Sequence, residues 1–288
     1  MGVMEKFRID GKVAWITGAA YGLGMAYAKA LAEAGARIVF NCRSQEHLDH
    51  AMEEYKAAGV EAYGAIVDVT KEEEVKKFAA DVKEKFGPIT ILFNNAGIIK
   101  RIPMTEMSLQ EWNQVIDIDL TGPFICSKAV IPDMIEQGGG KIINACSMMS
   151  ELGRETVSAY AAAKGGLKML TKNICSEYGQ YNIQCNGIGP GYIATPQTAP
   201  LRKPREDGSM NPFDRFIRSK TPAQRWGTTE DLMGLAVFLA SPASDFINGQ
   251  IVYIDGGILA YIGQDPSNLD ESKFRGVKEE ENIEVNDK

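Results

Sequence analysis

The sequence predicts one α/β domain, built as a doubly wound parallel sheet with helices on both faces. Three observations support this fold class. Short apolar runs alternate along the chain with longer helical stretches, as repeated strand–helix–strand units do. A glycine-rich loop lies between the first apolar run and the first helical stretch. The length of 288 residues and the hydrophobic share of 44% suit a single large core.

The predicted strands are short apolar runs, which are typical of parallel strands buried on both faces. They cover residues 13–17, 37–40, 62–67, 89–93, 141–145, 183–188 and 250–254. The predicted helices cover residues 22–35, 45–58, 72–86, 108–137, 158–179 and 230–240. The 108–137 stretch is unusually long, and we expect a break near Gly122-Pro123.

Two segments depart from this alternation. Residues 192–227, called the lid segment below, hold five prolines and a basic cluster that includes Arg202. This segment is too long for a plain connection, so we expect it to cover a substrate site. Residues 264–288 form a charged tail, expected to be mobile or to pack on a neighbouring subunit. Residues 1–263 would then form the catalytic domain.

Composition argues against several classes of protein. The net charge of −7 disfavours nucleic-acid binding, and no apolar run approaches the length of a membrane helix. The N-terminal residues lack the apolar stretch of a signal peptide, so a cytoplasmic protein is expected. The five cysteines are scattered without a CxxC pair, which indicates neither a metal site nor a disulfide framework. His47 and His50 lie in a polar helical stretch, and no catalytic role is assigned to them.

The loop after the first strand, Thr17 to Gly24, is typical of a pyrophosphate site. Gly18 allows the tight turn, Gly22 lets a phosphate approach the backbone, and Gly24 lets the helix lie close to the sheet. The helix N-terminus adds free N–H groups and a partial positive charge. The spacing GxxxGxG differs from the more familiar GxGxxG, and a turn without a ligand is the alternative interpretation. We expect a dinucleotide to bind Gly18, Tyr21, Gly22, Leu23 and Gly24.

The end of the second strand bears on the choice between NADP and NAD. An acidic residue there binds the ribose 2′-hydroxyl of NAD, but this chain has Asn41-Cys42-Arg43-Ser44 instead. Arg43, next to Ser44, could pair with a 2′-phosphate, which favours NADP, with NAD as the alternative. Asp68, followed by Val69, is placed to accept a hydrogen bond from adenine. A surface arginine and a helix-capping aspartate are the competing interpretations of these two side chains.

Ser147, Tyr160 and Lys164 form the predicted catalytic group. Tyr160 and Lys164 are four residues apart in a helical stretch, so they share a face. A lysine cation favours the phenolate and should lower the tyrosine pKa toward working pH. Such a tyrosine can exchange a proton with a carbonyl or hydroxyl oxygen, and the Ser147 hydroxyl can hold the same oxygen. The alternative is a surface helix preceded by a capping serine.

These motifs, with Asn94-Asn95-Ala96-Gly97 and Pro190-Gly191, resemble the short-chain dehydrogenase/reductase family over roughly residues 10 to 257. The resemblance implies a seven-stranded Rossmann-type sheet, hydride transfer with NAD(P)H, and a homotetramer. It also implies that Lys164 binds the nicotinamide ribose. The remaining contacts that it implies are Asn95 and Gly97 on the adenosine side and Pro190, Gly191, Ile193 and Thr195 at the nicotinamide end.

One position departs from the general family pattern. The family usually has asparagine in N-L-x-G-x-F, where it supports a water that leads to the lysine, whereas this chain has Asp119-Leu120-Thr121-Gly122-Pro123-Phe124. An aspartate offers no amide donor, and an ionised one would raise the pKa of the lysine. Asp119 is therefore kept as a candidate catalytic residue whose contribution to proton relay is open.

An acidic substrate would need an arginine near Tyr160, and Arg101, Arg154 and Arg202 are the candidates, with solvated or structural arginines as the alternative. The 147–160 segment and the end Asp255–Gly263 resemble gluconate 5-dehydrogenases, which implies interconversion of D-gluconate and 5-keto-D-gluconate. The alternatives are a reductase of a related keto acid such as 2-keto-3-deoxygluconate or of a 3-oxoacyl thioester, a non-catalytic NADP-binding regulator, and a methyltransferase.

Overall fold

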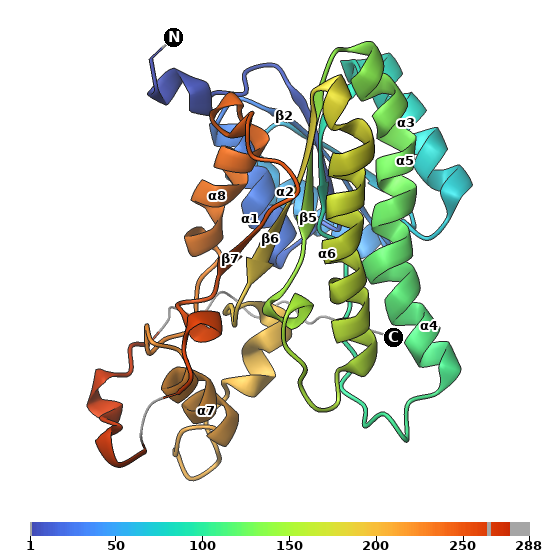
Figure 1. Cartoon of the computed structure of the whole chain (residues 1–288). Coiled ribbons are helices and arrows are strands. Elements are labelled where there is room, and N and C mark those ends of the chain that lie inside the picture. The colour runs from blue at the N-terminus through green and yellow to red at the C-terminus, as the bar shows by residue number, and fades with distance from the viewer. Residues whose placement is uncertain (1, 264–265, 277–288) are drawn as a thin grey trace.

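A computed structural model describes residues 2–263 and 266–276. Seven parallel strands form one sheet in the order β3-β2-β1-β4-β5-β6-β7, which confirms the predicted fold class (Figure 1). The strands are β1 (Val13–Thr17), β2 (Arg37–Cys42), β3 (Ala62–Ile66), β4 (Ile89–Asn94), β5 (Gly140–Ala145), β6 (Ile183–Pro190) and β7 (Ile251–Ile254). Within the described residues, no helix is both long and apolar enough to cross a membrane.

Eight α-helices among the described residues surround the sheet. They are α1 (Gly22–Glu33), α2 (Gln45–Ala57), α3 (Glu72–Phe86), α4 (Leu109–Ile116), α5 (Gly122–Glu136), α6 (Ser158–Tyr178), α7 (Pro212–Lys220) and α8 (Glu230–Ala240). Helices α1, α2 and α8 cover one face of the sheet, and α3, α5 and α6 cover the other (Figure 1).

The two covered faces explain why the strands consist of continuous apolar runs. All five residues of β1 are buried. Ala14 and Ile16 belong to the core under α1, α2 and α8, whereas Val13 and Trp15 belong to the core under α3, α5 and α6. Because neighbouring side chains of a strand point to opposite faces, both sets must be apolar.

The strand order places a ligand site at one edge of the sheet. β1 lies between β2 and β4, so the chain reverses its winding direction there. Such a switch point leaves a crevice at the carboxyl ends of the strands, where ligands of open α/β sheets bind. Thr17, at the end of β1, connects this strand to the loop that follows β4. Its hydroxyl accepts hydrogen bonds from the backbone N–H groups of Asn95 and Ala96, both at 2.9 Å.

The long predicted helix 108–137 is interrupted one turn earlier than expected. A π-helical turn, Asp117–Thr121, separates α4 from α5. Pro123 lies in the first turn of α5, where a missing backbone N–H costs little, so the break does not fall on the proline. The extra residue of a π turn rotates the side chains around it, and this turn carries Asp119.

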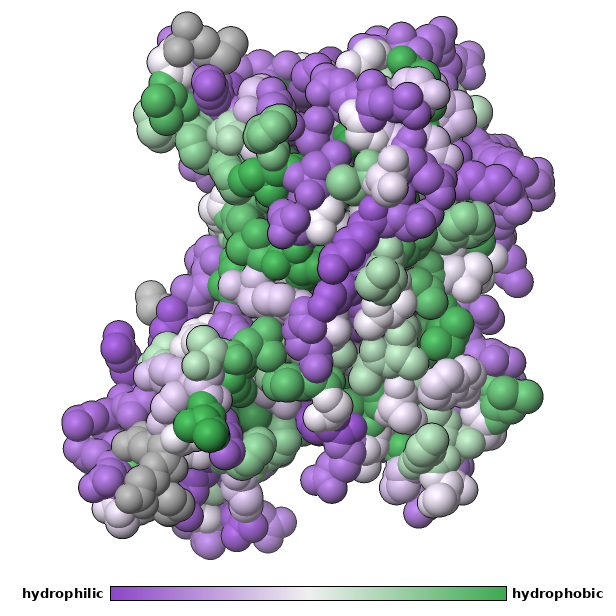
Figure 2. Space-filling model, in the orientation of Figure 1, coloured by the Kyte–Doolittle hydropathy of each residue, from purple (hydrophilic) through white to green (hydrophobic). Residues whose placement is uncertain are grey.

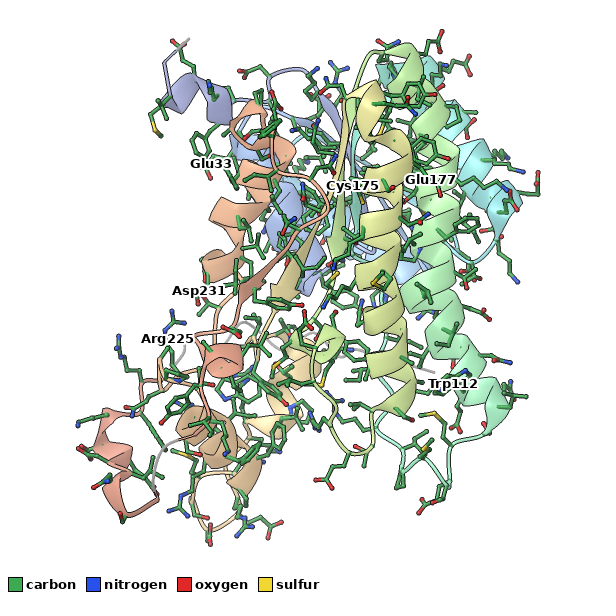
Figure 3. The ribbon with its side chains drawn as sticks, in the orientation of Figure 1. Glu33, Trp112, Cys175, Glu177, Arg225 and Asp231 are labelled. Carbon is green, nitrogen blue, oxygen red and sulfur yellow. The ribbon has the colours of Figure 1, made fainter. Side chains whose placement is uncertain are left out.

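The two ends of the lid segment lie next to each other. Ile193 and Gly227 form a parallel bridge, and the Arg225 guanidinium makes a two-point ion pair with Asp231 at the start of α8, with N–O distances of 2.6 and 2.9 Å (Figure 3). Between these ends lie a 3₁₀ turn and α7, a helix that the sequence did not predict.

The described part of the tail packs on this lid segment. Glu271 pairs with Arg215, and the Arg275 carbonyl accepts from Arg218; both arginines belong to α7. The tail was predicted to be mobile or to contact a neighbouring subunit; in its described part, Glu271 and Arg275 contact α7 of the same chain. The predicted tail residues 264–265 and 277–288 lie outside the described part of the chain.

Apolar side chains also reach the surface at β7, the edge strand that pairs with β6. The four residues of β7 are all partly exposed, and Leu235, Val237 and Phe238 of α8 are only partly buried. Figure 2 shows apolar residues gathered over these two elements, while hydrophilic residues cover much of the surrounding surface.

Candidate active site

A cavity of about 620 Å³ opens at the carboxyl ends of the strands, beneath the lid segment. Residues from both halves of the chain line it. Apart from Arg202, every residue proposed above for coenzyme, chemistry or substrate lines this one cavity: Gly18, Tyr21, Gly22, Leu23, Gly24, Arg43, Ser44, Asp68, Val69, Asn95, Gly97, Arg101, Asp119, Ser147, Arg154, Tyr160, Lys164, Pro190, Gly191, Ile193 and Thr195.

The glycine loop has the geometry of an anion cradle. Gly18 and Gly22 have φ angles of +66° and +56°, a region that side-chain-bearing residues rarely adopt. A Cβ on Gly24 would lie 2.5 Å from Asn95 Nδ2 and 2.7 Å from the Gly18 carbonyl oxygen, so only glycine fits between the helix and the loops. No side chain caps the N-terminus of α1, which leaves its first N–H groups for a phosphate. The cradle therefore fits the pyrophosphate of a dinucleotide.

Three polar residues surround the expected adenosine end. The Asn95 amide donates to the Thr17 and Gly18 carbonyls, so this side chain holds the glycine loop. Asp68 uses one carboxylate oxygen to accept from both donors of Thr70, and Lys71 rather than Asp68 occupies the cap position of α3. Arg43 is exposed and makes no hydrogen bond or ion pair with another described residue. A free guanidinium at this position fits a 2′-phosphate.

The catalytic candidates converge on the side chain of Lys164. Its ammonium donates to the Ala145 carbonyl at 2.8 Å, lies 3.2 Å from Asp119 Oδ2, and sits 5.5 Å from the centre of the Tyr160 ring. Ser147 lines the same cavity as Tyr160, and its hydroxyl acts to lower the Tyr160 pKa. The 160/164 spacing on α6 brings the two side chains together, and the end of β5 supplies Ala145 and Ser147.

Asp119 is fully buried, and its partners are specific. Its Oδ1 accepts from the Ile98 backbone N–H at 2.8 Å, while Oδ2 faces Lys164. Gly97 lies so close that a Cβ there would be 2.9 Å from Oδ2. The π turn thus carries the carboxylate to the lysine, and Gly97 makes room for it.

These contacts change the acidity of all three groups. Burial raises the pKa of Tyr160 above its usual value, and the Lys164 cation offsets that rise only in part. The prediction that the tyrosine pKa falls toward working pH is therefore wrong in its net direction, although the effect of Lys164 has the expected sign. Burial also raises the pKa of Asp119. For Lys164, burial acts to lower the pKa, but Asp119 and Tyr160 together outweigh it, and the net shift is upward.

The three candidate arginines separate into two groups. Arg101 and Arg154 line the cavity, and neither makes an ion pair with a described carboxylate. Partial burial lowers the pKa of Arg101, and the like charge of Arg154 lowers it further. Arg202 does not line the cavity; its guanidinium donates to the Thr195 carbonyl and lies 5.7 Å from the centre of the Trp226 ring. Burial among the apolar residues of the lid segment explains why Arg202 points away.

Several lining residues were not predicted from the sequence. Tyr192 follows the Pro190-Gly191 motif directly, so its place on the cavity could have been inferred from the motif. Glu46 and His47 also line the adenosine end, because the first turn of α2 follows β2 there. Met148 and Met149 add apolar surface after Ser147. Within the described residues, no group of three or more acidic, histidine or cysteine side chains could hold a metal ion.

Comparisons with known proteins agree with this geometry. The profile of a family described as Enoyl-(Acyl carrier protein) reductase matches residues 18–259. The 2-dehydro-3-deoxy-D-gluconate 5-dehydrogenase of Formosa agariphila is 55% identical over 266 residues, which are 92% of this chain and 98% of that protein. The chain therefore belongs to the short-chain dehydrogenase/reductase family of oxidoreductases.

Two solved structures are similar over most of the chain. The 2-keto-3-deoxy-D-gluconate dehydrogenase from Streptococcus agalactiae is 63% identical, with a TM-score of 0.79, covering 90% of this chain and 98% of that one. A gluconate 5-dehydrogenase from Burkholderia cenocepacia, in complex with NADP and tartrate, is 40% identical, with a TM-score of 0.84, covering 91% of this chain and 100% of that one.

Proposed function

We propose that this protein is an NADP(H)-dependent oxidoreductase that acts at C5 of a six-carbon sugar acid. The observation that carries the proposal is the pair of cavity arginines, Arg101 and Arg154, which lack an acidic partner among the described residues and line the same cavity as the candidate proton donor Tyr160. Two guanidiniums without a counter-charge favour a substrate that brings its own carboxylate.

The coenzyme would occupy the deeper part of the same cavity. The glycine loop and the start of α1 would hold its pyrophosphate, Asp68 and Asn95 would flank the adenosine, and Arg43 would meet the 2′-phosphate. Thr195 and the Pro190-Gly191 turn would contact the nicotinamide end. When bound, the coenzyme supplies or accepts the hydride.

The protein's own groups would handle the proton and orient the substrate. Tyr160 gives its hydroxyl proton to the substrate oxygen during reduction and takes a proton back during oxidation. Ser147 donates a hydrogen bond to the same oxygen and fixes its position. Lys164 stabilises the phenolate, and Asp119 holds the ammonium in place while keeping it protonated.

Sequence identity to the named relatives suggests an order in which to test the candidate substrates. The two most similar proteins compared above, at 55% and 63% identity, are named for 2-keto-3-deoxy-D-gluconate, and a third, at 40%, is named for gluconate. We therefore propose 2-keto-3-deoxy-D-gluconate and its 5-keto derivative as the first substrate pair. D-Gluconate and 5-keto-D-gluconate, which the sequence motifs indicated, are the second.

Coenzyme absorbance over time tests this proposal. The protein is mixed with NADPH or NADH and each 5-keto acid, and with NADP⁺ or NAD⁺ and each alcohol, beside a 3-oxoacyl thioester. Faster turnover of either sugar-acid pair than of the thioester supports the proposal and selects the substrate. Turnover of the thioester alone would overturn the substrate class, and tight NADPH binding without any turnover would favour a regulator.

We also propose that the protein is a cytoplasmic homotetramer. The partly exposed apolar residues of β7 and α8 support self-association, because an edge strand with apolar neighbours is normally covered. The family's usual assembly supports the number of subunits. The five free cysteines support a reducing compartment such as the cytoplasm.

A further inference from the structure

The guanidinium of Arg154 is held by two aromatic residues of the lid segment. Its Nη1 donates to the Tyr192 hydroxyl at 3.3 Å, and its Cζ lies 4.8 Å from the centre of the Phe213 ring. Arg154 itself belongs to the segment between β5 and α6 and lines the cavity. The contact therefore joins the lid segment to the loop that follows Ser147.

Phe213 is fixed by its own surroundings. It begins α7, where its backbone N–H is capped by the Asn211 side chain at 2.9 Å. Its ring packs edge-on against Tyr192, with centroids 5.8 Å apart, and Tyr192 packs edge-on against the buried Trp226 at 5.4 Å. The Trp226 indole donates to the buried carboxylate of Asp214, the residue after Phe213, at 2.7 Å. The ring that faces Arg154 thus rests on a rigid cluster.

The way in which Arg154 is held leaves its remaining donors available. A guanidinium carries five N–H donors, all in one plane. The Phe213 ring attracts the cation through its π electrons and is not a conventional hydrogen-bond acceptor, so of these donors Tyr192 takes one, from Nη1. The other donors stay in the plane of a group that lines the cavity and has no carboxylate partner among the described residues. This arrangement suits two parallel hydrogen bonds to a carboxylate.

We propose that Phe213 and Tyr192 are positioning residues that orient Arg154 for the substrate carboxylate, so that the lid segment sets the preference for acids over uncharged sugars. The inference rests on the proposed function and deepens it. Neither aromatic side chain takes part in the proton transfer. They restrict the arginine to one orientation. This restriction lowers the entropic cost of binding the carboxylate of an acid, whereas an uncharged substrate does not use the arginine in this way.

The test compares two substrates that carry the same reacting carbonyl. One is the favoured 5-keto acid, and the other is 5-keto-D-fructose, which has a C5 carbonyl and no carboxylate. Phe213→Leu removes the ring face but keeps an apolar side chain, Phe213→Tyr restores the ring, and Tyr192→Phe removes the hydroxyl. Phe216→Leu is the matched control, because Phe216 lies on the same helix and its ring is 6.1 Å from that of Phe213, but it is exposed and has no cation–π contact with Arg154.

We expect Phe213→Leu to raise KM for the acid about tenfold, as loss of a partly buried cation–π contact would, with kcat and the KM for NADPH nearly unchanged. Kinetics with 5-keto-D-fructose, measured as a substrate or as a competitive inhibitor, should not change. Phe213→Tyr should restore the KM for the acid, Tyr192→Phe should raise it less, and Phe216→Leu should match the unmodified protein.

Two results would overturn the inference: equal losses with both substrates, which indicate a merely structural role, or no change in the KM for the acid. Arg154→Gln separates this failure from that of the proposed function. If Arg154→Gln raises the KM for the acid while Phe213→Leu does not, the arginine binds the carboxylate without help from the lid segment. If the unmodified protein does not prefer the acid and Arg154→Gln changes nothing, the proposed function itself fails.

Discussion

At the scale of single residues, the charge on Lys164 acts to lower the pKa of both Asp119 and Tyr160. The ammonium is buried, and its contacts are the Ala145 carbonyl, the Asp119 carboxylate and the Tyr160 ring. A buried cation without such partners would lose its proton. Asp119 keeps the lysine protonated, and the lysine in turn opposes the effect of burial on Tyr160.

Tyr160→Phe tests the proton donor. The change removes one hydroxyl and keeps the ring, so we expect kcat to fall by roughly 100- to 10,000-fold, the usual contribution of a general acid/base. NADPH binding, measured by fluorescence titration, should stay within a few-fold of the unmodified protein. Turnover close to normal would show that another group transfers the proton.

Asp119→Asn tests the carboxylate in the π turn. Because the negative charge of Asp119 raises the pKa of Tyr160, its removal should lower that pKa. Alcohol oxidation needs the unprotonated tyrosine, so its pH–rate profile should move toward lower pH. The rate on the plateau should fall far less than the roughly 100-fold expected for loss of the general base. A profile that stays in place would contradict the assigned influence of Asp119 on Tyr160.

Arg43→Ala tests coenzyme selection. Arg43 has no partner among the described residues, so the change should disturb little besides the 2′-phosphate contact. Loss of a charge-assisted hydrogen bond corresponds to about 10- to 100-fold weaker NADPH binding. NADH binding should change much less, as measured by the Kd of each coenzyme. Equal losses for both would refute the contact.

At the scale of elements, the strands could be predicted closely because each is an apolar run covered on both faces. β1 and α8 match their predicted bounds, and the other strands differ by one or two residues at their ends. The sequence did not predict α7, since Pro204 and Gly208 precede it, Pro212 is its first residue, and its buried apolar residues pack within the lid segment. The π turn was also not predicted, because π and α turns share nearly the same residue preferences.

The candidate site could be predicted where motif residues follow strands. The ends of parallel strands meet at one edge, so Gly18, Asn95 and Ser147 lie on one cavity although they are far apart in the chain. Arg202 could not be placed, because its orientation depends on Trp226, a contact that no local pattern reveals. The net pKa shift of Tyr160 was missed for a similar reason, since burial is a property of the folded chain.

The buried carboxylate of Asp214 should govern the stability of the lid segment. It accepts from Arg218 Nε and from the Trp226 indole, both at 2.7 Å. Asp214→Ala leaves a largely buried guanidinium and an indole N–H without this partner, a change that costs about 3–5 kcal/mol in comparable sites. Hydrogen exchange should show the loss of protection in α7, while the central strands stay protected.

Asp207→Ala is the control for this experiment. Asp207 lies in the same segment but is exposed, and among the described residues its carboxylate accepts only from Ser209. Its removal should change the protection of α7 by little. If both variants behave alike, the cluster around Asp214 does not hold the lid segment together.

At the scale of the whole molecule, both edge strands of the sheet, β3 and β7, are partly exposed, and β7 lies beside partly exposed apolar residues of α8. β7 pairs only with β6 among the described strands, and its residues are partly exposed beside α8. We expect the solution mass, measured by light scattering or sedimentation, to be four times the chain mass of 31.5 kDa. A monomer that persists at micromolar concentration would contradict the proposed tetramer.

The closed base of the lid segment has a consequence for how such a scaffold can change. The chain leaves the sheet and returns at Ile193 and Gly227, and the Arg225–Asp231 pair fastens the returning end. A loop closed at one point can be lengthened at a cost of only about 0.6 kcal/mol for each doubling. New cavity walls can therefore be grafted between these two residues while the sheet, the glycine loop and the proton-transfer group keep their geometry. In this molecule, the residues that set the substrate preference can therefore change without altering those that fold the sheet.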